Sequence, residues 1–226
     1  MSEIGLGRRH APDERDRNYL LPRRAPLGPS SKHWLSLGPV LDQGGTSQCV
    51  AYSGTKYLTT HPIVNKPPLA PADLYRECQR VDEWPGEEPD YEGTSVRALF
   101  KVLKRIGLVT EYRWAFDAPT VISHVLTRGP VVLGTDWHLD MFTPDRWGYI
   151  WPIGESVCGH AYLMIGASQA RKNPDGTVGA ARILNSWGPN WAERGRAWLA
   201  FHALEYLIAN QGEACCATEI KAPKEG

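Results

Sequence analysis

Apolar residues change their spacing along the chain near residue 111, and the change separates two kinds of predicted element. Before that point they recur every three or four residues, which is typical of amphipathic helices. After it, most apolar runs are short and lie between turn-forming residues, which is typical of strands. The predicted helices lie at 49–60, 71–81, 96–106 and 120–128, and the predicted strands at 131–135, 149–153, 160–167, 180–185, 196–201 and 215–220. Helices first and strands second indicate an α+β fold.

Capping residues support two of these helices. Thr94 or Ser95 can cap the helix that ends before Gly107, and its apolar positions share one face. The helix over 71–81 carries Cys78 on its apolar face, where a cysteine usually serves as a small core residue. The segment 172–176, Lys-Asn-Pro-Asp-Gly, has the composition of a hairpin turn between two strands.

The segment 40–53 has the features of a nucleophile loop. An extended entry with two glycines leads to Cys49, which the following apolar spacing places in the first turn of a helix. Unpaired N–H groups and the positive end of the helix dipole favour a thiolate at that position. Gln43, six residues upstream, carries an amide that can donate to an oxyanion.

A thiolate nucleophile needs a base, and the base needs a partner that orients it. His160 opens one apolar run predicted as a strand, and Asn185 ends another. Four side chains lie at the ends of regular elements: Gln43, Cys49, His160 and Asn185. They can therefore converge on one cleft.

These motifs resemble those of the papain-like cysteine proteases, peptidase family C1. The matching residues are Gln43, Gly44, Cys49, Ala51, Tyr52 and Ser53 around the nucleophile, Gly159, His160, Ala161 and Gly166 around the histidine, and Asn185, Ser186, Trp187, Gly188, Trp191 and Gly195 around the asparagine. They occur in the family's order over residues 43–195, which is a far more specific signal than an isolated Cys–His pair.

The resemblance implies a two-lobe fold with a cleft that accepts an extended peptide. A helical lobe over 35–112 would carry the nucleophile, and a β-rich lobe over 113–226, an antiparallel sheet or barrel, would carry His160 and Asn185. Gly159 and Trp187 are assigned to the substrate side of the cleft, Trp187 also as a shield over the His–Asn hydrogen bond. Gly93 resembles the family glycine that pairs with the substrate backbone; an ordinary turn before a helix cap is an equal interpretation.

Three departures from the family pattern indicate a trimmed member of microbial or viral type. Val50 replaces the aromatic residue that usually follows the nucleophile, and Thr46 stands where the family commonly has a disulfide cysteine. Cys49 and His160 are 160 − 49 = 111 positions apart, whereas about 130 or more is usual.

Composition limits the remaining functions. The 25 basic and 25 acidic residues cancel, so charge predicts neither a nucleic-acid nor a membrane partner.

Five cysteines form no regular framework, which suggests mostly free thiols. Cys158 is a rival nucleophile on the same strand face as His160, but it lacks a helix terminus and is placed on the cleft wall. Neither it nor His138 has metal-ligand spacing, so no metal and no cofactor is expected.

The first 34 residues are expected to form an N-terminal surface arm without a core of its own, because they are polar and rich in proline. The 42 residues before Gln43 are fewer than the family's usual inhibitory prodomain needs. The arm contains no apolar signal region, and no run approaches about 18 apolar residues. We expect a cytoplasmic or virus-particle location without a secretion signal or a transmembrane segment.

The predicted function is hydrolysis of peptide bonds in an extended peptide or protein substrate. The alternative is a papain-like scaffold that serves as a non-catalytic binding or assembly module in a larger particle or toxin, its partner unknown. A third possibility keeps the chemistry and changes the substrate, as in isopeptide cleavage or transfer to an amine.

Overall fold

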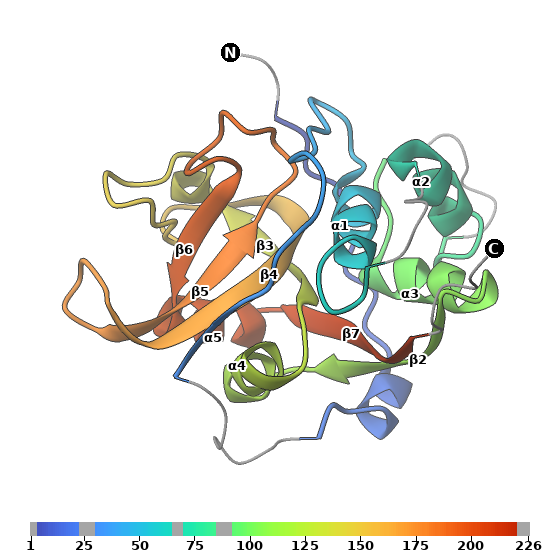
Figure 1. The fold of residues 1–226 in the computed structure, drawn as a ribbon. Helices are drawn as coiled ribbons and strands as arrows, with labels where there is room; N and C mark the ends of the chain where they lie inside the picture. The colour runs from blue at the N-terminus through green and yellow to red at the C-terminus, as the bar shows by residue number, and fades with distance from the viewer. Residues whose placement is uncertain (1–3, 23–29, 65–69, 85–91, 221–226) are drawn as a thin grey trace.

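An antiparallel sheet dominates the second half of the computed structural model (Figure 1). Residues 4–22, 30–64, 70–84 and 92–220 are described by the structure. The sheet contains β1 (Ser31–His33), β2 (Val109–Ala115), β3 (Val131–His138), β4 (Ser156–Lys172), β5 (Val178–Leu184), β6 (Arg196–Ala200) and β7 (Glu213–Ile220). Its order is β2-β7-β3-β4-β5-β6, and β1 pairs with β4. Neighbouring strands are antiparallel throughout.

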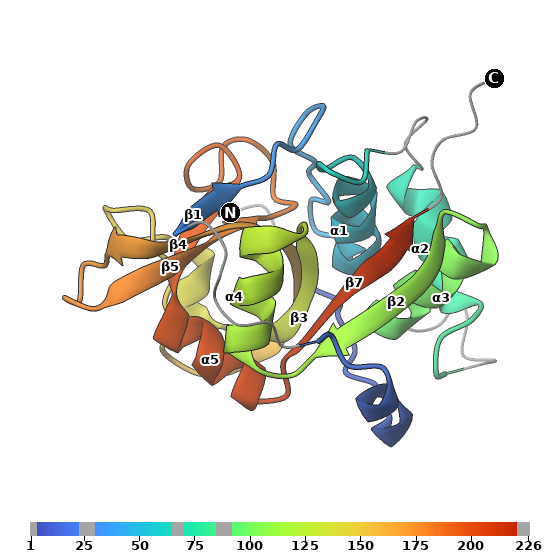
Figure 2. The same ribbon diagram turned by 60° about the horizontal axis from the view of Figure 1, so that its bottom comes forward.

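Helices precede and flank this sheet. They are α1 (Cys49–Leu58), α2 (Pro71–Gln79), α3 (Val96–Arg105), α4 (Ala118–Thr127) and α5 (Phe201–Ala209), with the 3₁₀ helices η1 (Glu14–Asn18) and η2 (Leu139–Phe142). α1 packs against β4 and α2, while α4 and α5 pack against the sheet and each other (Figure 2). The predicted α+β class is therefore confirmed.

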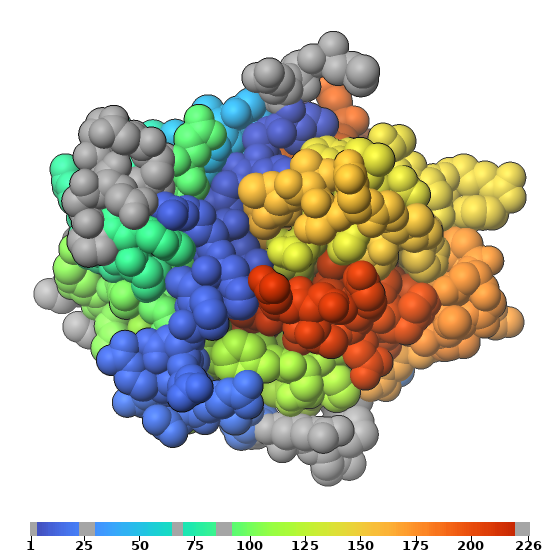
Figure 3. All heavy atoms as spheres, turned by 180° about the vertical axis from the view of Figure 1, so that it is seen from behind, coloured from blue at the N-terminus to red at the C-terminus, as the bar shows by residue number. Residues whose placement is uncertain are grey.

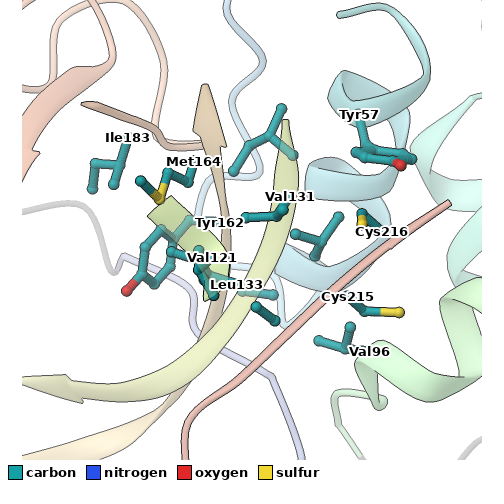
Figure 4. Packing of buried hydrophobic residues seen from close by; sticks show 14 of the residues in the cluster. Tyr57, Val96, Val121, Val131, Leu133, Tyr162, Met164, Ile183, Cys215 and Cys216 are labelled. Carbon is teal, nitrogen blue, oxygen red and sulfur yellow. The ribbon is translucent and has the colours of Figure 1, made fainter. Parts of the chain in front are cut away.

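One core joins the helices to the sheet. Tyr57 of α1, Val96 of α3 and Cys215 of β7 belong to the same cluster of buried side chains (Figure 4). At the start of α3, Ser95 accepts a hydrogen bond from the Ala98 N–H (3.0 Å) and Gly107 follows the helix with φ +78°, as the sequence predicts. Cys78 is fully buried on α2, also as predicted. The predicted hairpin turn joins β4 to β5.

One strand prediction fails, and some elements were not predicted. The strand predicted over 149–153 is absent: only Tyr149 forms a bridge, to Trp198, because the Asp145 carboxylate accepts from the backbone of Trp147 and Tyr149 and closes a turn there. β6 confirms the strand predicted over 196–201 except for its last residue, Phe201. Phe201 begins α5, a helix that was not predicted, and Ala203, Leu204, Leu207 and Ile208 recur at helical spacing on its buried side. β2 was not predicted as a strand. No helix within the described residues is long and apolar enough to cross a membrane.

Candidate active site

Cys49 begins α1, the position that the sequence predicts. Its side chain is fully buried, and its Sγ accepts a hydrogen bond from the Ala161 N–H at 3.4 Å. Ala161 follows His160 on β4, so this contact brings the histidine strand against the start of α1. No side chain caps the first turn of α1. The N–H groups of that turn therefore have no side-chain acceptor at the end of the helix where Cys49 lies.

His160 and Asn185 form a hydrogen-bonded pair. The ring Nε2 lies 2.8 Å from the Asn185 Oδ1, so that the N–H on Nε2 donates to the amide oxygen. The other ring nitrogen, Nδ1, is buried and has no hydrogen-bond partner among the described residues. Asn185 is held in place by its own N–H, which donates to the Gly195 carbonyl at 2.9 Å. A histidine oriented through one nitrogen in this way keeps the other nitrogen for proton transfer.

Gln43 is also buried, with its amide held at both ends. Its Oε1 accepts from the Ser186 hydroxyl at 2.6 Å, which fixes the direction of the amide. Its Nε2 donates to the Thr46 carbonyl (2.7 Å) and to the Gly5 carbonyl (3.1 Å). The amide group therefore already holds a carbonyl oxygen from another part of the chain.

Two tryptophans enclose the histidine ring. Trp187 stacks on His160 with ring centroids 4.8 Å apart, and Trp137 meets it edge-on at the same distance. The sequence motif predicts the Trp187 contact, whereas Trp137 was missed because a tryptophan in a buried strand is ordinarily a core residue. Both rings exclude water from the imidazole, which makes its charged form costly.

Residues 5–9 of the N-terminal arm do not lie on the surface, whereas most of residues 14–22 are exposed as predicted. Residues 5–9 run between the start of α1 on one side and β4 on the other, and Figure 3 shows this segment (blue) lying between the helical half and the sheet half of the molecule. Gly5 N–H donates to the Gly44 carbonyl, and Gly7 and Arg8 N–H both reach the Gly159 carbonyl, at 3.1 and 3.0 Å. The prediction failed because a polar, proline-rich composition does not reveal backbone pairing.

Glycines allow this close approach. A Cβ on Gly5 would lie 2.0 Å from the Thr46 carbonyl oxygen, and one on Gly7, whose φ is +142°, would lie 2.3 Å from the Ser47 oxygen. On the opposite wall, a Cβ on Gly159 would lie 2.2 Å from the Arg8 oxygen. Distances below 3.0 Å force atoms to move, so the arm and the walls around it fit only with glycine at these positions.

Gly93 also lacks room for a side chain, and its N–H is already paired within the chain. A Cβ there would meet the Gly7 oxygen at 2.3 Å. Its N–H donates to the Tyr75 hydroxyl at 2.9 Å instead of to a peptide in the site. The neighbouring Thr94 pairs with the arm: its N–H donates to the Gly7 carbonyl and its carbonyl accepts from the Arg9 N–H, in a parallel bridge with Arg8.

Arg8 anchors the arm. Its side chain is 1% exposed, and its Nε donates to Glu213 Oε1 at 3.1 Å while its Nη2 donates to the Gln211 carbonyl at 2.7 Å. Asp136 lies 3.8 Å from its Nη1. A buried guanidinium with this many acceptors resists displacement, because removing it would leave Glu213 buried without its partner.

Burial keeps the candidate catalytic pair uncharged. It raises the pKa of the Cys49 thiol to about 12, against the smaller opposing effect of the Ala161 hydrogen bond. Burial also lowers the pKa of His160 to about 4, with the Asn185 hydrogen bond acting in the opposite direction. Both the thiol and the imidazole are therefore uncharged at ordinary pH, whereas nucleophilic attack requires the thiolate.

Cys158 lies close enough to Cys49 to contribute to the raised pKa of its thiol. Cys158 is exposed on β4, two residues before His160. No group of three or more His, Cys, Asp or Glu side chains that could hold a metal ion occurs in the described part of the chain.

The fold has close counterparts among solved structures. No family model and no curated protein sequence matches the chain. Xylellain, a cysteine protease from Xylella fastidiosa, superposes with a TM-score of 0.71 at 18% identity, over 98% of this chain and 99% of that one. The chain has the papain-like fold. Two further similar structures are a digestive procathepsin L 3 from Tenebrio molitor (TM-score 0.68, 15% identity, 96% of this chain and 76% of that one) and bromelain from Ananas comosus in complex with the E64 inhibitor (0.63, 15%, 84% and 99%).

Proposed function

We propose that this papain-like chain is a cysteine peptidase in which Cys49, His160, Asn185 and Gln43 carry out the reaction. The observation that supports it best is the position of the Gly5 carbonyl. This oxygen accepts from the Gln43 amide, which is the group assigned to the oxyanion, and the same oxygen accepts from the Trp187 ring N–H at 3.1 Å. A peptide carbonyl therefore already fits the place where the reacting carbonyl of a substrate would be held.

In the proposed reaction, the Cys49 thiolate attacks a peptide carbonyl and forms a carbon–sulfur bond. The Gln43 amide and the Cys49 N–H stabilise the negative charge that develops on the carbonyl oxygen. His160 gives its proton to the leaving amine, and the C–N bond breaks. It then takes a proton from water, and the resulting hydroxide attacks the thioester. The carbon–sulfur bond breaks, the carboxylic acid product leaves, and the Cys49 thiolate and the protonated His160 are restored. Asn185 keeps the imidazole oriented through both steps.

The arm gives this peptidase a resting state. While residues 5–9 occupy the site, Cys49 and His160 are both fully buried and uncharged. Withdrawal of the arm would let water reach both groups and lower the cost of the thiolate–imidazolium pair. We propose that an extended peptide substrate binds where the arm now lies.

Complete burial of the two reactive groups also favours a second candidate, a binding module that never turns over. The two functions separate in a peptidase assay on the reduced protein. A peptidase cleaves a peptide library once the arm is displaced and stops when Cys49 is replaced by Ala. A binding module cleaves nothing in either form.

A further inference from the structure

A cavity of about 960 Å³ lies beside the sheet and is lined by residues outside the candidate active site. His33 of β1, the loop 144–148, Arg171 of β4, Arg182 of β5 and Trp198 of β6 line it, together with Ala192 and Glu193. None of these residues belongs to the site described above. The cavity is called the Trp198 cavity below.

Two guanidinium groups share the indole of Trp198. The Cζ of Arg171 lies 3.9 Å from the ring centroid and the Cζ of Arg182 lies 4.7 Å from it. The Arg171 Nε also donates to the Tyr149 hydroxyl at 2.7 Å. Stacking and this hydrogen bond fix the direction of the guanidiniums and leave their remaining N–H groups for other acceptors.

Acceptors for those N–H groups are scarce within the described chain. Arg182 is 8% exposed and donates to Glu193 through Nη2 at 2.5 Å, but its Nη1 is buried and has no hydrogen-bond partner among the described residues. No carboxylate in the same described ranges lies within 4 Å of a nitrogen of Arg146 or Arg171. A buried donor without an acceptor is costly, so the Arg182 guanidinium retains hydrogen-bonding capacity that the described residues do not use.

The acidic residue of the loop is already used. Asp145 Oδ1 accepts from the backbone of Trp147 (2.8 Å) and Tyr149 (2.9 Å), and its Oδ2 accepts from the Trp151 ring N–H (2.9 Å). These bonds shape the loop that carries Arg146, whose guanidinium stacks at 3.9 Å on the Trp147 ring. The carboxylate therefore builds the cavity wall instead of neutralising the arginines.

The positive charges also act on one another. Burial lowers the pKa of Arg182, Glu193 raises it, and Arg196 and Arg171 lower it further. The pKa of His33 is lowered by burial and then by Arg182 and Arg196. Glu193, the carboxylate that pairs with Arg182, is itself 65% exposed, so solvent screens much of its charge.

We propose that the Trp198 cavity binds a phosphate group, held by Arg171 and Arg182 in fixed orientations with Arg146 at the rim. The planar guanidinium fork matches phosphate oxygens, and charge-assisted bonds from arginine to phosphate are among the stronger hydrogen bonds in proteins. The proposal is independent of the peptidase chemistry.

Isothermal titration calorimetry of the full chain with inorganic phosphate and with pyrophosphate tests this directly. We expect saturable binding at one site, weakened at least about tenfold by Arg171→Gln because two charge-assisted hydrogen bonds are lost. Arg146→Gln, at the rim, should weaken binding less, and circular dichroism would verify that each variant folds.

Arg76→Gln is the matched control. Arg76 lies on α2, is 64% exposed and pairs with Asp73, so this variant loses the same unit of charge at a distant place and should bind as the wild type does. Cys49→Ala should also bind normally, which keeps this test separate from that of the peptidase. The proposal would be overturned if neither phosphate nor pyrophosphate bound saturably. It would also be overturned if Arg76→Gln and Arg171→Gln weakened anion binding equally.

Discussion

At the scale of single residues, the account depends on what Cys49, His160, Asn185 and Gln43 each contribute. Replacing Cys49 by Ala removes the nucleophile and little volume, so thermal unfolding should change little while peptidase activity disappears. Gln43→Ala should retain the nucleophile and lower kcat by about 10²–10³, since one oxyanion donor is lost. Asn185→Ala should leave a weaker but measurable enzyme because His160 is only misoriented. Equal and complete loss in all three variants would indicate a folding defect instead of this division of roles.

Thiol chemistry gives a second residue-scale prediction. In the wild-type chain, Cys158 is exposed whereas Cys49 is fully buried with a pKa raised to about 12. Iodoacetamide should therefore label Cys158 first, as mass spectrometry of the peptides would show. Displacing the arm should reverse the order. Fast labelling of Cys49 in the intact chain would mean that the arm does not protect it.

At the scale of elements, the arm is the segment that covers the proposed active site. Gly5→Ala and Gly7→Ala place a Cβ about 2 Å from the backbone of Thr46 and Ser47, so each should loosen the arm and raise peptidase activity. Tyr19→Ala, a change at a 55% exposed side chain of the same arm, is the control and should leave activity unchanged. If both glycine variants have wild-type activity, the arm does not restrain the site.

The stability of α3 offers a separate element-scale measurement. Its cap is the Ser95 hydroxyl, which accepts from the Ala98 N–H. Ser95→Ala should lower the free energy of unfolding by about 1 kcal/mol in urea titrations. A change near zero would mean that the cap is replaced by another acceptor.

Element predictions succeeded where one local signal decides the structure. The cap at Ser95 and the single glycine after the helix, Gly107, locate α3, and the cysteine at a helix start locates α1. The strand expected over 149–153 failed because the side chain of Asp145, several residues upstream, organises that backbone. The prediction for residues 5–9 of the arm failed for a similar reason. Their backbone pairs with residues 39 positions (Gly5 with Gly44) to 152 positions (Gly7 with Gly159) away, and no local pattern encodes such pairing.

At the scale of the whole molecule, acid should oppose the covered state. The pKa of His160 falls from an ordinary 6.5 to about 4 in this state, so the unfolded or opened chain binds a proton that the covered site excludes. The stability from this group is therefore complete above about pH 6.5 and lost as pH falls to about 4, an effect on the order of 3 kcal/mol. Glu213 acts in the opposite direction. Burial raises its pKa, so the covered state binds a proton at this carboxyl more readily than the opened chain does, and this smaller effect favours the covered state as pH falls.

The rate of Cys49 alkylation between pH 4 and 8 measures this effect. It should increase as pH falls below about 6.5, because opening of the arm allows the thiolate–imidazolium pair to form. A simple buried thiol would react faster only as pH rises toward its pKa. A rate of Cys49 alkylation that only rises with pH would contradict opening of the arm by acid.

The central claim is that a papain-like peptidase site lies beneath the arm, and turnover after release of the arm tests it most directly. Hydrolysis of a fluorogenic peptide library would be measured for the reduced Gly7→Ala chain and for the same chain with Cys49→Ala added. We predict cleavage by the first protein and none by the second. If the Gly7→Ala chain cleaves no peptide although iodoacetamide alkylates its Cys49 readily, the site is open and inactive, and the peptidase function is contradicted.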